Sequence, residues 1–419
     1  MSDRDPGDPS SPFGDMFSEV PLFREIQRVL MSGSGPVNWE LARQVGIATA
    51  TMGAEDPPPA EDDRKGLAET VRAAELAVAD FTLLPMPGDL AEVQAFRRAQ
   101  WIEANIRGLR DMIDPIASKL AAALGQLSGA AGPEPGGGFG FQPPSASPSL
   151  PGMDSPPGEE GPDQEAFLRQ MMGSIGPLLM GVQVGTALGA LGQRVLGQFD
   201  LAVPRPDGAM YFVVPNIAAF EHEWELPTKE FRAYVAVHEV AHRFEFARPW
   251  AREHFLSLVR DLVEHADVDL SGLQQRMEGL DVSNPEALSD AFDGLGNLFG
   301  EAATGEQRLR VARVQAFLSA AEGYADHVVE GVGGRMLPSF SRIKEAMRRY
   351  HEGRPADQAL ERLLGLEMKL EQYRLGAAFC ERVASDTDEA TLSRMWGSAE
   401  SLPSMPELEE PTLWLSRMA

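Results

Sequence analysis

The stretch PTKEFRAYVAVHEVAHRFEF, residues 227–246, carries the clearest helical pattern in the chain. Phe231 and Val235 belong to a set of apolar residues that recur along it at helical spacing. Thr228 is of a residue type that caps helix N-termini, and no helix breaker follows before Pro249. The sequence therefore predicts one unbroken helix that begins just after Thr228.

Two histidines and a glutamate on this predicted helix point to metal chemistry. His238 and His242 are four residues apart, so both rings project from one face and suit two ligands of a tetrahedral Zn²⁺. Glu239 lies to one side, where its carboxylate can take a proton from a metal-activated water without binding the metal. Arg243 is unusual directly after the second histidine of such a site. The alternative is that the two histidines make ordinary polar contacts.

Two histidines leave such a site incomplete, and downstream carboxylates are candidates for a third ligand. Glu245 points only partly toward the histidine face, and Glu253 and Glu264 lie on a separate helical stretch. Glu322 and Asp326 are four apart on an otherwise apolar helix in LSAAEGYADHVVEG, where two carboxylates are costly without a cation. The pattern favours Glu322 as the ligand and Asp326 as acceptor of the other ring N–H of a zinc histidine. The alternative is an exposed acidic pair.

Peptide hydrolysis through such a site also needs a second group that stabilises the oxyanion. The candidates that the sequence offers are Tyr324, His327, Tyr373 and Arg374. For each of them a packed or surface polar residue is the simpler interpretation.

Composition excludes several other classes of protein. The chain has 419 residues and a formal net charge of −26, which argues against nucleic-acid binding and against attachment to anionic membranes. Its one cysteine, Cys380, excludes an intrachain disulfide and a multi-thiolate metal site. The N-terminus shows no basic and apolar leader, so we expect a cytoplasmic protein.

One uncharged run, residues 170–193, is long enough to span a bilayer. Pro177 and several glycines lower its hydrophobicity. Gly181, Gly185 and Gly189 are spaced by four, which favours a buried helix with a glycine face against which a neighbouring helix packs closely. We therefore expect no stable membrane insertion.

The chain divides by composition into four regions. Residues 1–20 are predicted to be disordered, 21–127 to be helical, 128–163 to be a Gly/Pro/Ser-rich linker or disordered insertion, and 164–419 to be the catalytic domain.

Within the first helical region, helices are expected after the N-cap Asn38, over 66–79 and from about Asp89. FDLAVP and AMYFVV flank turn residues 205–208 and predict a β-hairpin, and AMYFVV is a candidate edge strand for an extended substrate. Helix after helix follows from about Pro227.

Helix breaks are expected at several positions in this last part of the chain, and the tail from Ser401 is expected to wrap the surface. The break positions are Pro249, Pro285, 294–300, 331–334 and 353–355.

HEVAH at 238–242 with the later Glu322 and Asp326 resembles the glutamate zincins. More closely, most of the chain is similar to the actinobacterial zincin-like metallopeptidase type 2 family. Matching stretches include GPVNWELARQVG, GVQVGTALGALGQRVLGQFDL, VPNIAAFE, EGYADHV and WGSAESLP. The resemblance implies a largely helical zincin with an N-terminal helical part, and supplies no substrate.

These observations predict a mainly α protein with a small β-hairpin or sheet, in a zincin-like fold with an N-terminal helical extension. The predicted function is zinc-dependent hydrolysis of a peptide or protein substrate, with one Zn²⁺ per chain held by His238, His242 and Glu322, and with Glu239 as the base. Alternatives are a zinc-stabilised binding or scaffold protein, or a zinc amidohydrolase acting on a small molecule. An intact Glu239 favours catalysis, because a purely structural zinc site needs no base.

Overall fold

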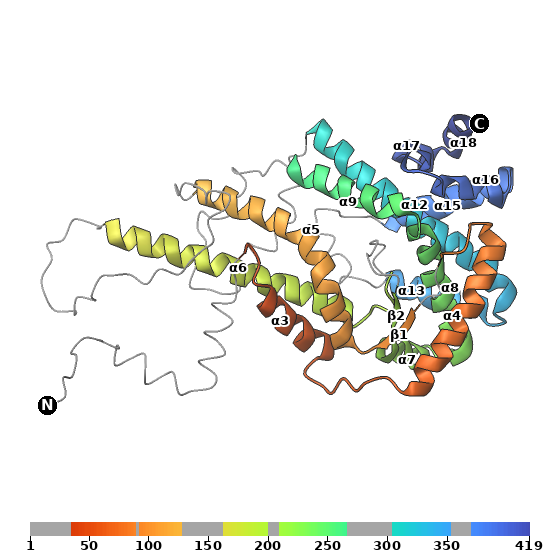
Figure 1. Cartoon of the computed structure of the whole chain (residues 1–419), viewed down its shortest axis with the longest axis horizontal. Helices are drawn as coiled ribbons and strands as arrows, with labels where there is room; N and C mark the ends of the chain where they lie inside the picture. The colour runs from red at the N-terminus through yellow and green to blue at the C-terminus, as the bar shows by residue number, and fades with distance from the viewer. Residues whose placement is uncertain (1–34, 89–91, 128–161, 200–208, 266–303, 353–369) are drawn as a thin grey trace, which may run out of the picture.

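The computed structural model describes residues 35–88, 92–127, 162–199, 209–265, 304–352 and 370–419 (Figure 1). These residues form a mostly helical structure with a two-stranded sheet, as the sequence predicted. The helices are α3 (Trp39–Thr51), α4 (Glu61–Thr82), α5 (Arg98–Leu127), α6 (Pro162–Gly192), α7 (Val214–Glu223), α8 (Thr228–Phe246), α9 (Pro249–Glu264), α12 (Gly305–Met336), α13 (Phe340–Glu352), α15 (Leu370–Asp386), α16 (Glu389–Ser393), α17 (Met405–Glu409) and α18 (Pro411–Met418). The strands are β1 (Glu92–Phe96) and β2 (Ala209–Val213).

The sheet differs from the predicted hairpin. β2 confirms the AMYFVV strand, but its partner is β1, which runs parallel to it with Glu92 opposite Ala209 and Phe96 opposite Val213. Most of the other half of the predicted hairpin, residues 200–208, lies outside the described residues.

The helix expected from about Asp89 is therefore wrong at its start, since α5 begins at Arg98. Val93 and Ala95 fall on one face of the strand by the period of two, and Ala95 is buried. These residues also have a helical spacing of apolar side chains, but burial of this face of the strand and pairing with β2 favour the strand.

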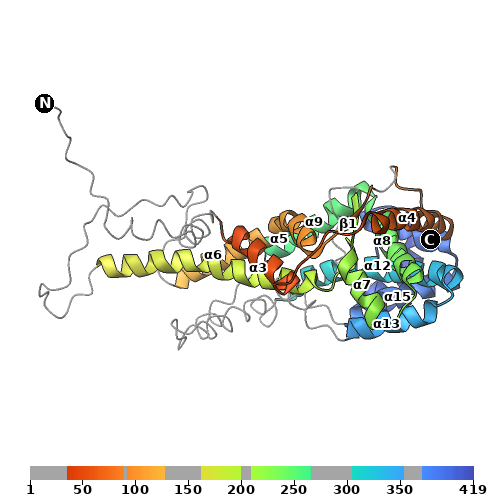
Figure 2. The ribbon, with the colours of Figure 1, turned by 90° about the horizontal axis from the view of Figure 1, so that it is seen from below.

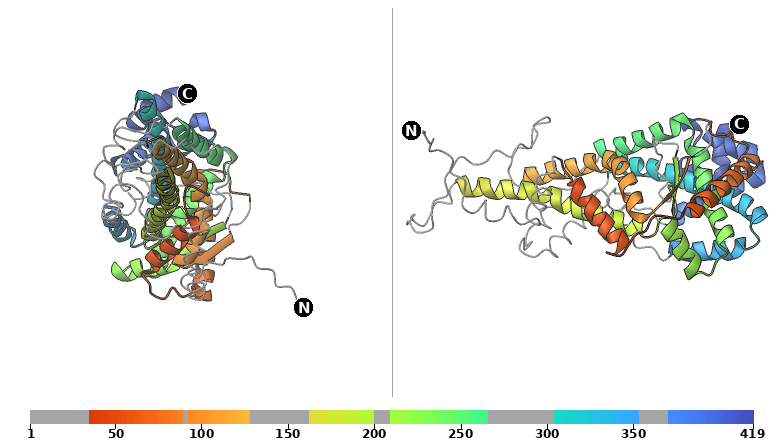
Figure 3. Two further views of the ribbon diagram at one scale, coloured as in Figure 1. Left: turned by 90° about the vertical axis from the view of Figure 1, so that its left-hand side faces the viewer. Right: turned by 60° about the horizontal axis from the view of Figure 1, so that its bottom comes forward.

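Helix α8 lies in the main hydrophobic core and packs against both α4 and α12. Phe231, Val240 and Phe244 of α8 are fully or almost fully buried there. In Figure 1 these helices gather with α13, α15 and the C-terminal helices at the right, while α3, α5 and α6 extend toward the left. The right-hand view of Figure 3 shows the same division from another direction. The histidine-bearing helix is thus central to its half of the molecule.

The glycine face of α6 packs against α3, which confirms the predicted close approach of a neighbouring helix. A Cβ added at Gly185 would lie 2.6 Å from the carbonyl oxygen of Ala42, and one at Gly181 would lie 2.6 Å from that of Asn38. Asn38 also caps α3, because its side chain accepts a hydrogen bond from the Leu41 N–H. The N-terminal end of α6 extends away from the rest of the molecule (Figure 2). None of the helices in the described part of the chain has the length and apolar character to cross a membrane.

Helix α12 continues through the break that was expected at 331–334 and ends at Met336. Its glycines serve packing instead: a Cβ at Gly331 would lie 2.2 Å from the ring of Phe81, and one at Gly333 would lie 2.5 Å from the ring of Phe340. The break at Pro249 is confirmed, since α9 begins there. The other expected breaks, at Pro285, 294–300 and 353–355, lie outside the described residues.

The C-terminal tail does more than wrap the surface. Trp414 of α18 is fully buried in the main core, and its indole N–H donates to the carbonyl oxygen of Ser401 at 2.8 Å. Arg417 forms an ion pair with Glu407 of α17. Burial of a large aromatic side chain fixes this end of the chain to the domain that bears the histidines.

Candidate metal centre

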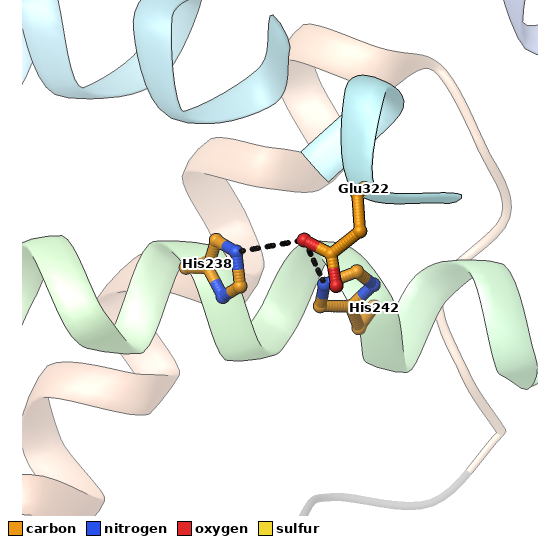
Figure 4. A group of neighbouring side chains, drawn as sticks. All are labelled: His238, His242 and Glu322. Carbon is orange, nitrogen blue, oxygen red and sulfur yellow. Dashed lines mark ion pairs between the residues drawn. The ribbon is translucent and has the colours of Figure 1, made fainter. Parts of the chain in front are cut away.

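Three side chains from two neighbouring helices meet at one point (Figure 4). His238 and His242 project from α8, and Glu322 reaches toward them from α12. Glu322 Oε2 lies 3.8 Å from His238 Nε2 and 3.9 Å from His242 Nε2. One potential ligand atom from each residue lies within 4.8 Å of the other two. This group could therefore hold a metal ion.

The burial of the three side chains is uneven. His242 is fully buried, whereas His238 and Glu322 keep 19% and 18% of their side chains exposed. His242 Nε2 has no hydrogen-bond partner among the described residues although it is buried. A buried polar nitrogen without a partner is costly, and a cation between the three side chains would satisfy it. Two imidazole nitrogens and one carboxylate oxygen are the donor types that zinc takes in catalytic sites.

The other ring nitrogen of His242 has a partner that the sequence analysis did not identify. His242 Nδ1 lies 2.9 Å from Glu245 Oε2, and both side chains are fully buried. The ring of Phe246 stacks on that of His242 with centroids 5.8 Å apart, and the ring of Phe199 tilts toward it at 5.7 Å.

The predicted acceptor, Asp326, is solvent-exposed on α12 and is not part of this contact. Glu245 is the partner of His242 because the C-terminal part of α8 is buried and keeps both side chains away from solvent. Helical spacing alone does not show this burial. That Asp326 accepts a hydrogen bond from a zinc histidine stays a prediction.

The electrostatics of the group follow from burial and from its carboxylates. Burial lowers the pKa of His242 to about 4, so its ring is neutral near pH 7. Burial also tends to lower the pKa of His238, but the carboxylates of Glu239, Glu322 and Asp326 outweigh it and raise that pKa to about 10. Burial raises the pKa of Glu322 to about 7. Without a cation, protons therefore occupy part of this donor set.

Glu239 is held by the segment that precedes β2. Its side chain is buried, and its Oε2 accepts a hydrogen bond of 2.8 Å from the backbone N–H of Phe199. A Cβ added at Gly197 would lie 2.3 Å from the carboxyl carbon of Glu239, so only glycine fits there without a shift. Oε1 of Glu239 lies 3.9 Å from His238 Nδ1.

The sequence analysis missed these contacts, and the available signal was the glycine in VLGQF, residues 195–199. The segment is attached to the sheet by a bridge from Gly197 to Phe212, and Leu196 accepts a hydrogen bond from the Val213 N–H. β2 therefore has neighbours on both sides, which does not suit the free edge strand suggested for AMYFVV.

The candidate oxyanion donors lie in different surroundings. Tyr324 is buried, and its hydroxyl lies 3.0 Å from Ser393 Oγ. It follows Glu322 by two helical positions, about 200°, and so faces the other side of α12. His327 Nε2 pairs with Glu389 at 2.9 Å. Arg374 is exposed, and the side chain of Tyr373 lies outside the described residues. Their suggested catalytic roles stay predictions.

Comparison with known proteins gives two findings. The sequence profile of a family described as zincin-like metallopeptidase matches residues 37–415. A crystal structure of a protein from Chloroflexus aurantiacus, described as a candidate hydrolase with a novel fold, is similar at 30% sequence identity and a TM-score of 0.61. The similarity covers 91% of this chain and 98% of that one. No curated protein matches the sequence.

Proposed function

This chain belongs to the zincin-like metallopeptidase family, and from that premise we propose that it is a zinc-dependent hydrolase that cleaves peptide bonds. The observation that carries the proposal is the convergence of His238, His242 and Glu322 within 4.8 Å of one another. The buried, unpartnered Nε2 of His242 supports a bound cation at this point. The proposal includes one Zn²⁺ per chain and the actinobacterial branch of the family that the sequence resembles.

Zn²⁺ held by these three residues would act as a Lewis acid and activate a water molecule. Glu239 is the residue that we assign to the proton transfer. The N–H of Phe199 fixes one of its carboxylate oxygens, which leaves Oε1 to accept a proton from water and to pass it to the leaving amine. A base that is held in place before the reaction loses less freedom on the way to the transition state.

The exposure of the three metal-facing side chains indicates the side from which a substrate approaches. His242 is fully buried, so the access lies on the side of His238 and Glu322, which remain partly exposed. A catalytic zinc site keeps one position open, whereas a structural zinc site is closed by protein ligands. Three protein ligands, of which His238 and Glu322 are partly exposed, fit the open kind.

The test joins metal analysis to a cleavage assay. Protein that has met neither chelator nor metal-affinity resin should contain about one zinc per chain, because the donor set is complete for a catalytic site. A proteome-derived peptide library should show cleavage by this protein. Glu239→Gln should keep the zinc and lose cleavage, whereas Glu306→Gln, an exposed residue at the start of α12, should keep both.

Three outcomes would decide against the proposal. Absence of any transition metal would exclude the metal centre. Zinc without cleavage of the library would favour the scaffold alternative, and cleavage at the wild-type rate by Glu239→Gln would remove Glu239 from the mechanism.

A further inference from the structure

We propose that Glu245 is a positioning residue that holds the ring of His242 in the orientation and tautomer that bind the metal. This inference rests on the metal binding in the proposed function, but not on peptide cleavage. It concerns a fully buried carboxylate, one turn after His242 on the same face of α8, for which spacing alone gave no role.

The tautomer follows from where the two ring nitrogens point. His242 Nε2 faces Glu322 Oε2 across 3.9 Å, in the gap where the three ligand atoms meet. A neutral imidazole that binds a cation through Nε2 keeps its lone pair there, so its one proton must lie on Nδ1. Nδ1 then donates to Glu245 Oε2, which lies 2.9 Å away.

The orientation of the ring is the second part of the argument. Phe246 and Phe199 contact the ring of His242 and restrict the plane in which it can lie. Such contacts hardly distinguish the ring from its 180° flip, which would place carbon atoms where the nitrogens are. The hydrogen bond to Glu245 distinguishes the two, because a carbon at the Nδ1 position cannot donate to a carboxylate.

The burial of Glu245 itself needs an explanation. Oε1 of Glu245 is buried and has no hydrogen-bond partner among the described residues, and the hydrogen bond of Oε2 in that part of the chain is with His242. A buried carboxylate with one hydrogen bond destabilises a fold, and an apolar side chain of the same size would pack without that cost. A cation on the far nitrogen of His242 would compensate the carboxylate through the ring, as carboxylate–histidine–metal arrangements do.

The experiment compares zinc affinity with the stability of the metal-free protein. Glu245→Met keeps the approximate volume but removes the acceptor and the buried carboxyl group. It should bind zinc about 10–100-fold more weakly, as changes to residues behind metal ligands do. Its melting temperature without metal should be equal to or higher than that of the wild type, because the buried carboxylate is gone. Zinc affinity is measured by competition with a chromophoric chelator.

Glu245→Gln is the conservative partner of this variant. Its amide oxygen can still accept from Nδ1, so it should recover most of the lost affinity. Glu75→Gln is the matched control: Glu75 is also a buried carboxylate against α8, but its contact is with Arg243 and not with a ligand, and zinc affinity should stay unchanged.

Three results would overturn the inference. The first is wild-type zinc affinity in folded Glu245→Met, and the second is an equal loss of affinity in Glu75→Gln and Glu245→Met. The third is a lower metal-free melting temperature in Glu245→Met, which is the result expected of a residue that only supports the fold. If the wild type binds zinc but cleaves no peptide, the proposed function fails and this inference stands.

Discussion

Two contacts in this molecule depend on a glycine that lies almost against its neighbour, one between α6 and α3 and one between residues 195–199 and α8. In the first, a Cβ at Gly185 would meet the backbone of Ala42 at 2.6 Å. In the second, a Cβ at Gly197 would meet the carboxyl group of Glu239 at 2.3 Å. A Cβ at the first glycine would meet the backbone of Ala42 and the Cβ of Val45, while one at the second would meet the carboxylate assigned to proton transfer.

The difference shows that a close approach at a glycine can contribute to stability in one place and to catalysis in another. Between α6 and α3 it buries apolar surface, so its contribution is to the free energy of unfolding. Between residues 195–199 and α8 the close approach fixes the position of the Glu239 carboxylate, so it contributes to the rate of the proposed reaction. Substitutions in the two places should therefore separate stability from activity.

The largest expected effect tests whether His238, His242 and Glu322, which lie next to the second contact, form a metal centre. Glu322→Ala removes one of three ligands, so zinc affinity should fall by more than the ~100-fold that marks the upper range for residues behind the ligands. Competition with a chelator measures it. Glu330→Ala, on the same helix but in an exposed ion pair with Lys344, is the control and should bind zinc like the wild type. Unchanged affinity in Glu322→Ala would remove Glu322 from the ligand set.

The second largest expected effect tests the contact between residues 195–199 and α8. Gly197→Ala should push the carboxylate of Glu239 out of place and lower the rate of peptide cleavage about 100-fold, the lower end of what a positioned base contributes. Zinc content should stay at the wild-type value, since no ligand is touched. Cleavage per zinc-loaded chain is the measurement. A wild-type rate in this variant would show that the absence of a side chain at position 197 does not matter for the position of Glu239. The proposed difference between Gly197 and Gly185 would then be wrong.

The metal centre should also respond to pH, which the contact between α6 and α3 should not. The pKa of His238 is raised to about 10 by its carboxylate neighbours against the effect of burial, and burial raises that of Glu322 to about 7. Both groups must release a proton to bind zinc, so affinity rises with pH. Above pH 7, where His238 is the one of the three ligands that still holds a proton, we expect about a tenfold rise per pH unit, and a steeper rise below it. Chelator competition at pH 6, 7 and 8 measures this, and a flat profile would contradict it.

The smallest effect concerns the contact between α6 and α3. Gly185→Ala should lower the free energy of unfolding by ~1–3 kcal/mol, because the added methyl group has no room. Gly108→Ala is the control, since a Cβ there meets nothing within 4 Å, and it should be neutral or stabilising. Urea titration measures both. A loss of zinc affinity in folded Gly185→Ala would show that the two regions are not independent.

Much of the helical fold could be predicted from local pattern. Asn38 marked the start of α3, and Pro249 marked the start of α9. The errors lie where a distant contact decides. Residues 92–96 form a strand because β2 pairs with them, and α12 runs through its glycines because Phe81 and Phe340 fill the space beside them. No local pattern carries the position of those partners.

For the candidate site, too, the features with a local signal were predicted and those that depend on distant contacts were not. The grouping of His238, His242 and Glu322 was expected, because spacing on one helix and two carboxylates on an apolar helix are local signals. The contacts of Glu245 and Phe199 were not expected, since one depends on the depth at which α8 is buried and the other on a segment from another part of the chain.

The parallel register of the sheet has a consequence for how the chain is made. Glu92 pairs with Ala209, so the paired positions are 209 − 92 = 117 residues apart. Parallel pairing over such a separation belongs to the slower class of folding events, because the entropy of closing the loop is lost before the distant contacts form. A chain that is still on the ribosome and ends before Val213 exposes β1 with both edges open. During synthesis, β1 is therefore a segment at risk of pairing with another copy of the chain.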